Sequence, residues 1–143
     1  MLHCTMKHRD ALDETICSIL TEFRRIAVVG MSEKPWRDSH RVGLYLHQNG
    51  YDVIPVNPAV ENIAGLTAYP GLKSGPGPLQ IVNVFRRLEF IPEVVEQAIQ
   101  CGAKALWTQL GLVENKSARR ARDAGMRVVM DRCIMVEHSL HLG

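Results

Sequence analysis

Hydrophobic residues in this chain are concentrated in short unbroken runs that recur from one end to the other. Runs of this kind, when rich in β-branched residues, predict buried β-strands. The predicted strands are Ile26–Val29, Asp52–Val56, Leu79–Phe85, Lys104–Trp107 and Met126–Met130.

The segments between most of these runs carry apolar residues at helical spacing. Asp38 or Ser39 is suited to cap the start of a helix, Pro92 suits a first turn, and Gly50 and Gly125 suit helix ends. The predicted helices run from Asp10 to Phe23, from Asp38 or Ser39 to Gly50, from Pro92 to Gly102, and from Glu114 to Ala124.

Strands that alternate with helices indicate an α/β fold with a parallel sheet. We expect a three-layer, doubly wound, Rossmann-like domain of about five strands with helices on both faces. A single domain should span residues 1–143, with residues 1–12 as a loosely ordered lead-in. Ligands of such folds bind at the carboxyl ends of the strands, where the strand order reverses. We expect that crevice between the first and the fourth strand.

One connection differs from the others. Between Val56 and Leu79 the chain reads NPAVENIAGLTAYPGLKSGPGP, which is rich in proline and glycine. We expect mostly loop there, with a short strand near Leu66–Tyr69. A long connection beside a sheet often shapes a pocket.

Composition narrows the class of protein. Of the 143 residues, 46% are apolar and 22% are charged, as in ordinary soluble domains. The net charge of +2 is too small for a nucleic-acid footprint. No apolar stretch approaches the roughly 20 residues of a membrane span, and the N-terminus lacks a signal-peptide core. We therefore expect a cytoplasmic protein that binds neither nucleic acid nor membranes.

The four cysteines, Cys4, Cys17, Cys101 and Cys133, include no C-x-x-C pair. A zinc site is therefore not expected, and we predict free thiols in a reducing compartment. The sequence also shows no nucleophile–base pair, no paired carboxylates and no metal-ligand cluster. We assign no catalytic and no metal-binding residue.

The stretch IAVVGMSEKPWRDS, residues 26–39, carries the first sign of a ligand. Gly30 follows a strand and allows a sharp turn with close backbone approach. The following amides and the start of the next helix favour a phosphate. Ser32 and Ser39 offer hydroxyls, Lys34 and Arg37 offer positive charge, and Pro35 stiffens the loop. A plain solvated loop is the alternative interpretation.

The tip of the second predicted strand argues against a nicotinamide cofactor. Such domains usually place Asp or Glu there to hold the ribose hydroxyls, whereas this chain has Asn57 followed by Pro58. At the end of the third strand, Phe85 is suited either to stack on a base or to join the core. Arg86 and Arg87 are suited to meet phosphates.

Five blocks of the sequence together resemble the small Rossmann-type CoA-binding proteins, relatives of the CoA-binding domain of the succinyl-CoA synthetase alpha subunit. The resemblance runs from about Ile16 to Gly143. The blocks are VVGMSEKPWRDS, YDVIPVNP, VFRRLEFIPEVVEQAI, GAKALWTQLGLVEN and AGMRVVMDRCIMVEH.

The resemblance implies a domain that binds coenzyme A or an acyl-CoA through its nucleotide end. The first-loop motif would hold the diphosphate and the ADP part. Asn57 and Pro58 would lie near the pantetheine or the phosphates. Phe85 and Arg86 would border the adenosine, and Thr108 and Gln109 would line the far wall of the cleft. The first-loop residues counted with the cofactor site are Gly30, Met31, Ser32, Lys34, Pro35, Arg37 and Ser39.

Departures from the family bear on affinity and chemistry. Relatives often carry a lysine where this chain has Ala59, which implies weaker binding or an altered pose. In the synthetase, the phosphorylated histidine belongs to a second domain. In this chain we interpret Glu137 and His138 as a polar pair that anchors the C-terminal tail. Cys133 is expected near the ligand face, as an inert thiol or as a partner for the CoA thiol.

We therefore expect a stand-alone, non-catalytic CoA-binding module, and the sequence leaves a protein partner or a homo-oligomer open. The alternatives are a CoA-site subunit of an acyl-CoA ligase-like assembly, an NAD(P)-dependent oxidoreductase, and a thiol-based sensor that uses Cys133.

Overall fold

The computed structural model describes residue 4 and residues 10–143, so most of the expected lead-in over residues 1–12 lies outside the described residues. All neighbouring strands of the main sheet are parallel. This confirms the predicted α/β class and the five strands. They are β1 (Arg25–Val29), β2 (Asp52–Val56), β5 (Ile81–Val84), β6 (Ala105–Thr108) and β7 (Arg127–Val129).

The order of the strands differs from the one expected. It is β2-β1-β5-β6-β7, so β1 lies between β2 and β5 and does not neighbour β6. The strand order therefore reverses between β1 and β5, and the expected crevice between the first and fourth strands was wrong. Patterns within a strand report its burial, whereas the choice of neighbour depends on the direction in which each crossover returns.

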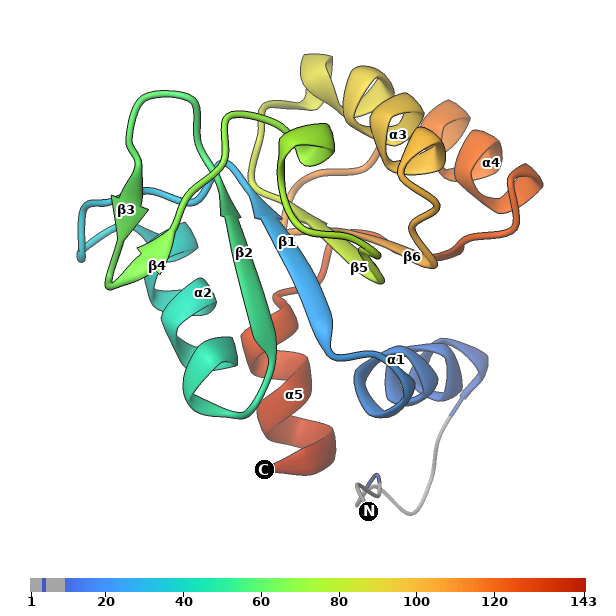
Figure 1. Cartoon of the computed structure of the whole chain (residues 1–143). Helices are drawn as coiled ribbons and strands as arrows, with labels where there is room; N and C mark the ends of the chain where they lie inside the picture. Colours follow the sequence, from blue (N-terminus) through green and yellow to red (C-terminus); the bar gives the residue numbers. More distant parts are fainter. Residues whose placement is uncertain (1–3, 5–9) are drawn as a thin grey trace.

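Helices cover both faces of the sheet (Figure 1). One face carries α1 (Ala11–Glu22), α2 (Asp38–Gln48) and α5 (Ile134–Leu142), and the other carries α3 (Ile91–Gln100) and α4 (Asn115–Asp123). Successive strand residues point to opposite faces. In β6, Leu106 thus packs under α3 and α4, while Trp107 packs under α1, α2 and α5.

The helix starts follow local chemistry, with one correction. Asp10 caps α1 as part of a capping box with Asp13, and Glu114 caps α4. The expected side-chain cap of α2 by Asp38 or Ser39 was wrong, because the N-cap is Arg37 and makes no side-chain cap bond. The Ser39 hydroxyl is instead engaged by the preceding loop.

Helix α5 was not expected, because residues after position 133 were read as a tail. Its buried residues are Ile134, Glu137, His138 and His141, which follow the spacing of one helical face. Three of these four are polar, so a search for apolar periodicity does not find the helix. His138 was expected to anchor the C-terminal segment. Its contact agrees with this role, since its Nδ1 lies 2.8 Å from the Tyr45 hydroxyl of α2.

The long connection after β2 contains the small hairpin of β3 (Asn62–Ile63) and β4 (Leu66–Thr67), followed by a single 3-10 turn, η1 (Leu72–Ser74). A second such turn, η2 (Leu88–Phe90), precedes α3. The strand expected near Leu66–Tyr69 is thus present in part, and Tyr69 bridges to Val56. This connection passes over the carboxyl end of β2 (Figure 1).

The prediction of four free thiols was wrong for two of them. Cys4 and Cys17 form a disulfide, while Cys101 and Cys133 are free. The two cysteines are separated by 13 residues, so the disulfide is not part of a C-x-x-C motif that could have predicted it. Within the described part of the chain, no helix is long and apolar enough to cross a membrane.

Candidate functional site

Gly30 forms the turn that leaves β1. Its φ of +88° is a conformation that other residues rarely adopt, and its amide donates a hydrogen bond of 2.9 Å to the Val56 carbonyl of β2. A β-carbon at this position would lie 3.2 Å from the Phe85 backbone oxygen and 3.4 Å from Arg86 Cδ. Both the backbone conformation and the tight space therefore require glycine.

Hydrogen bonds inside the first loop use the two serines that were expected to meet a ligand. The Ser32 amide donates to the Ser39 hydroxyl at 2.9 Å, and the Lys34 amide donates to the Ser32 hydroxyl at 3.1 Å. His40 Nδ1 lies 2.9 Å from the Ser32 carbonyl oxygen. The two serine hydroxyls therefore fix the conformation of the loop. They hold the Ser32 and Lys34 amides close to the start of α2.

Asn57 joins the ends of β1 and β2. Its side-chain amide donates to the Met31 carbonyl at 3.0 Å, and its Oδ1 accepts from the Ala59 amide at 2.8 Å. The Met31 side chain itself is fully buried against Gly43 of α2. Met31 therefore belongs to the core, and only its backbone takes part in the loop.

The positive charges of the first loop stand at its outer side. Lys34, Pro35 and Arg37 are exposed, and Lys34 Nζ lies 5.9 Å from the centre of the exposed Trp36 ring. Lys34 and Arg37 line a shallow hollow of about 440 Å³. Its other lining residues are Gly30, Ser32, Asp38, Ser39 and Phe85.

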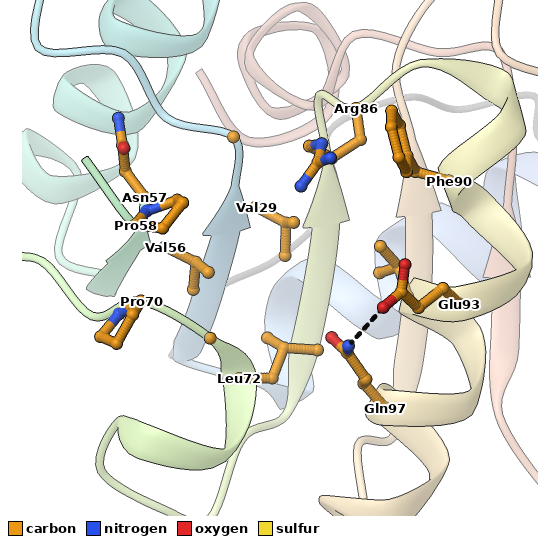
Figure 2. Close-up of a pocket in the computed structure, with 13 residues that line it drawn as sticks. Val29, Val56, Asn57, Pro58, Pro70, Leu72, Arg86, Phe90, Glu93 and Gln97 are labelled. Atoms are coloured by element: carbon orange, nitrogen blue, oxygen red, sulfur yellow. Dashed lines mark hydrogen bonds between the residues drawn. The ribbon is translucent and has the colours of Figure 1, made fainter.

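A second hollow, of about 430 Å³, opens at the point where the strand order reverses (Figure 2). It is bounded by the ends of β1 and β2, by the connection after β2, and by α3. Arg86 reaches it with its guanidinium 4.1 Å from the centre of the Phe90 ring. Glu93 also lines it and accepts a hydrogen bond of 3.4 Å from Gln97. Asn57 and Pro58 form part of its rim.

The third hollow, of about 500 Å³, lies between the end of β5 and the start of α5. Phe85, Arg86, Gln109 and Cys133 line it. Gln109 is buried, and its Oε1 accepts a hydrogen bond of 3.3 Å from the Ile134 amide. Cys133 is half-buried and lines the same hollow as Phe85 and Arg86.

Thr108 lines none of these hollows. It is fully buried, and its hydroxyl donates a hydrogen bond of 2.6 Å to the Leu112 carbonyl. It thus closes the loop after β6. The other expected site residues gather along one edge, because Gly30, Phe85 and Arg86 are shared between neighbouring hollows.

Sequence reasoning missed part of the lining. Phe90, Glu93 and Gln97 come from η2 and α3, and Pro70 and Leu72 come from the long connection after β2. Only the proline- and glycine-rich composition of that connection hinted at a pocket. The residues of α3 gave no signal, because their places follow from the packing of that helix over β1 and β5.

The groups with shifted pKa lie outside these three hollows. Hydrogen bonding by Ser117 lowers the pKa of Glu114. Burial raises the pKa of Tyr51 and lowers the pKa of His138.

Comparison with known proteins agrees with this geometry. The family model of the CoA binding domain matches residues 24–139. The uncharacterized protein YneT of Bacillus subtilis (strain 168) is 42% identical over 125 residues, which are 87% of this chain and 93% of that protein. A solved structure, a hypothetical protein from Pyrococcus horikoshii OT3, has a TM-score of 0.89 and 39% identity, and the match covers 97% of this chain and 100% of that chain.

A much longer protein is also similar. The ADP-forming acetate–CoA ligase II of Archaeoglobus fulgidus is 28% identical over 100 residues. These are 67% of this chain but 15% of the ligase, so the chain corresponds to a small part of that enzyme. From the matched residues and the edge built around Gly30, this chain belongs to the CoA-binding domain family and is related to the acyl-CoA ligases.

Proposed function

We propose that this chain binds coenzyme A or an acyl-CoA through the ADP–diphosphate end, as a stand-alone, non-catalytic module in the cytoplasm. The observation that carries the proposal is the turn at Gly30. There a β-carbon on Gly30 would lie 3.2 Å from the Phe85 carbonyl oxygen, and hollows open on both sides. A bulky anionic nucleotide can approach the backbone at such a turn.

The diphosphate is assigned to the hollow beside the first loop. Lys34 and Arg37 supply positive charge, and α2 begins there with a first turn that has no side-chain cap. The start of a helix attracts anions through its amides and its dipole. Asp38 opposes this attraction, but its carboxylate is paired with Arg41.

The adenosine is assigned to the hollow at the strand-order reversal, with Arg86 over its entrance. Arg86 already stacks on Phe90, so a base that enters would meet a cation and an aromatic ring together. Asn57 and Pro58 would border the path between the two hollows. Gln109 would form the far wall, and Thr108 would act only by holding the loop after β6.

A second candidate function is favoured by the relationship with the ligase. The chain could supply the CoA site to a catalytic partner, as a subunit of an acyl-CoA ligase-like assembly. Leu110 and Val136 are exposed apolar residues on the rim of the third hollow, where a partner would meet an acyl group. Co-purification of a stable partner together with acyl-CoA-forming activity would favour this function over a stand-alone module.

Calorimetric titration tests the proposed ligand. Coenzyme A, acetyl-CoA, ADP and NAD are titrated into the wild type and into Arg37→Ala and Arg86→Ala. Each substitution removes a charge-assisted contact, so the affinity for coenzyme A should fall by about 1–3 kcal/mol, or roughly 5- to 150-fold.

Arg119→Ala is the matched control, because Arg119 is an exposed arginine of α4 and lines none of the hollows. It should leave the affinity unchanged. Binding of NAD in place of coenzyme A would favour the oxidoreductase alternative. Equal losses in all three variants would show that only a diffuse charge effect is being measured.

A further inference from the structure

Three potential metal ligands meet at the opposite edge of the sheet from the CoA site. Cys4, Cys17 and His141 each place one ligand atom within 4.8 Å of the other two. Cys17 lies in α1 and His141 in the last turn of α5. Figure 1 shows α1 and the C-terminal end of α5 beside the end of the sheet where β1 and β2 begin. The spacing of these residues along the chain did not predict the cluster.

The histidine is oriented as a metal ligand would be. His141 is 1% exposed, and its Nδ1 lies 3.4 Å from Cys17 Sγ. Its other nitrogen, Nε2, lies 3.3 Å from Glu137 Oε2 and 3.7 Å from Asp13 Oδ1. The two carboxylates thus lie on the Nε2 side of the ring, and the sulfur lies on the Nδ1 side. Metal-bound histidines commonly have such a carboxylate behind them.

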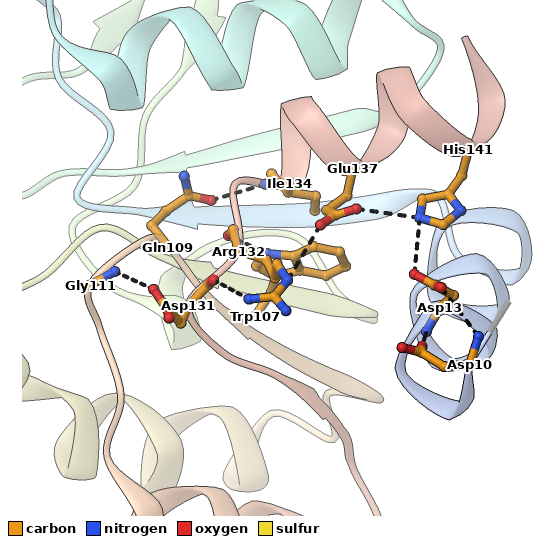
Figure 3. A network of polar contacts seen from close by, with 10 residues as sticks. All are labelled: Asp10, Asp13, Trp107, Gln109, Gly111, Asp131, Arg132, Ile134, Glu137 and His141. Atoms are coloured by element: carbon orange, nitrogen blue, oxygen red, sulfur yellow. Dashed lines mark hydrogen bonds and ion pairs between the residues drawn. The ribbon is translucent and has the colours of Figure 1, made fainter. Parts of the chain in front are cut away.

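The carboxylate is itself held in place (Figure 3). Glu137 Oε1 lies 3.5 Å from Arg132 Nε, so Arg132, which precedes α5, forms a row with Glu137 and His141 of that helix. Asp13 approaches His141 from α1, and its carboxylate accepts a hydrogen bond of 3.2 Å from the Asp10 amide. Carboxylates from two helices thus position the imidazole. A disulfide between Cys4 and Cys17 does not require these contacts.

The sulfur-to-nitrogen distance suits a tetrahedral cation. With Zn–S near 2.3 Å and Zn–N near 2.0–2.1 Å, a tetrahedral zinc requires an S···N separation of about 3.5 Å. Cys17 Sγ and His141 Nδ1 are already 3.4 Å apart. Cys4 would supply the third ligand, since its sulfur is bonded to that of Cys17. Among the described residues, the group consists of these three ligands.

We propose that Cys4, Cys17 and His141 form a site for a thiophilic divalent cation such as Zn²⁺, and that the disulfide is its oxidised, metal-free form. Reduction requires a thiol reductant. Two external thiols supply two electrons and two protons, the bond between the cysteine sulfurs breaks, and the external thiols leave as a disulfide. The cation then binds two thiolates and the imidazole and releases the two thiol protons to solvent.

The test uses Co²⁺ as a spectroscopic probe and Zn²⁺ in competition with a chromogenic chelator, under anaerobic conditions. Reduced wild type should bind one equivalent of Co²⁺ with a thiolate-to-metal charge-transfer band, and oxidised wild type should show no such band. Cys4→Ser should weaken Zn²⁺ binding by more than roughly 100-fold, because loss of a ligand should exceed the effect of an outer partner. Glu137→Gln should weaken it by about 10- to 100-fold.

Cys101→Ser is the matched control, since Cys101 is a free cysteine at the end of α3. It should bind the metal as the wild type does. The proposal is overturned if reduced wild type gives no charge-transfer band, or if Cys4→Ser and oxidised protein bind Zn²⁺ as tightly as reduced wild type. The comparison of reduced with oxidised wild type needs no substitution, so a misfolded variant does not block the test. Coenzyme A binding is measured separately, and neither result decides the other.

Discussion

Gly30 and Phe85 approach each other so closely that a β-carbon on Gly30 would lie 3.2 Å from the Phe85 carbonyl oxygen. The two residues directly follow β1 and β5, the neighbouring strands at which the order of the sheet reverses. We expect their contact to set the width of the gap through which a ligand reaches the backbone.

Gly30→Ala should therefore weaken coenzyme A binding and lower stability together. The positive φ alone should cost about 1–3 kcal/mol in the free energy of unfolding. Gly50→Ala is the matched control, because Gly50 has a φ of +89° with no atom near its would-be β-carbon. Denaturant unfolding should show a loss in both variants, but calorimetry should show weaker binding only in Gly30→Ala. Equal binding by the two variants would contradict a role for the gap.

Asn57→Ala should loosen the ends of β1 and β2. It removes the hydrogen bonds to the Met31 carbonyl and from the Ala59 amide, each worth about 0.5–1.5 kcal/mol. We expect lower stability and weaker coenzyme A binding. Asn62→Ala provides the comparison, since Asn62 accepts a hydrogen bond only from the nearby Gly65 amide within its own turn. If Asn57→Ala unfolds at the same denaturant concentration as Asn62→Ala, the bridging role is wrong.

Ala59→Lys should strengthen coenzyme A binding. Ala59 is exposed beside Asn57, and the family resemblance implies a lysine at this position. An exposed charge contact is worth up to about 1 kcal/mol, or roughly fivefold in affinity, and salt screens it. Calorimetry at low and high salt should therefore show a gain that fades as salt rises. Ala59→Gln, which adds length without charge, should show no such gain. A gain that is independent of salt would argue against a phosphate contact.

Stability should fall as the pH is lowered through the range in which histidines titrate. Burial, followed by the charge of Arg24, lowers the pKa of His138 below its ordinary value of 6.5. Below that value the unfolded chain takes up a proton at this residue before the folded chain does. The unfolded state is then favoured, so the contribution of His138 is complete above 6.5 and is lost as the pH falls toward the folded-state pKa.

Thermal melts at about pH 7.5 and about pH 5.5 check this expectation. The drop in melting temperature should be smaller in His138→Gln than in the wild type. His47→Gln should behave as the wild type does, because His47 is exposed in the last turn of α2. An unchanged drop in His138→Gln would show that other groups cause the acid sensitivity.

The sequence by itself determined the elements whose signals are local. Unbroken apolar runs marked all five strands of the sheet, because strands covered on both faces need apolar residues on both sides. Gly30 after the first run marked the sharp turn that follows β1 in the structure. Family blocks in the right order also pointed to the family that the comparisons show.

Only the tertiary structure decided what depends on residues distant along the chain. The long connection after β2 returns to place β5 beside β1. The strand order therefore reverses between β1 and β5, and not between β1 and β6 as expected. Helix α5 shows no apolar periodicity in the sequence, because histidines and a glutamate fill its buried face. The meeting of Cys4, Cys17 and His141 joins the two ends of the chain. Local patterns report which face of an element is buried, whereas folding alone decides which distant side chains share that buried space.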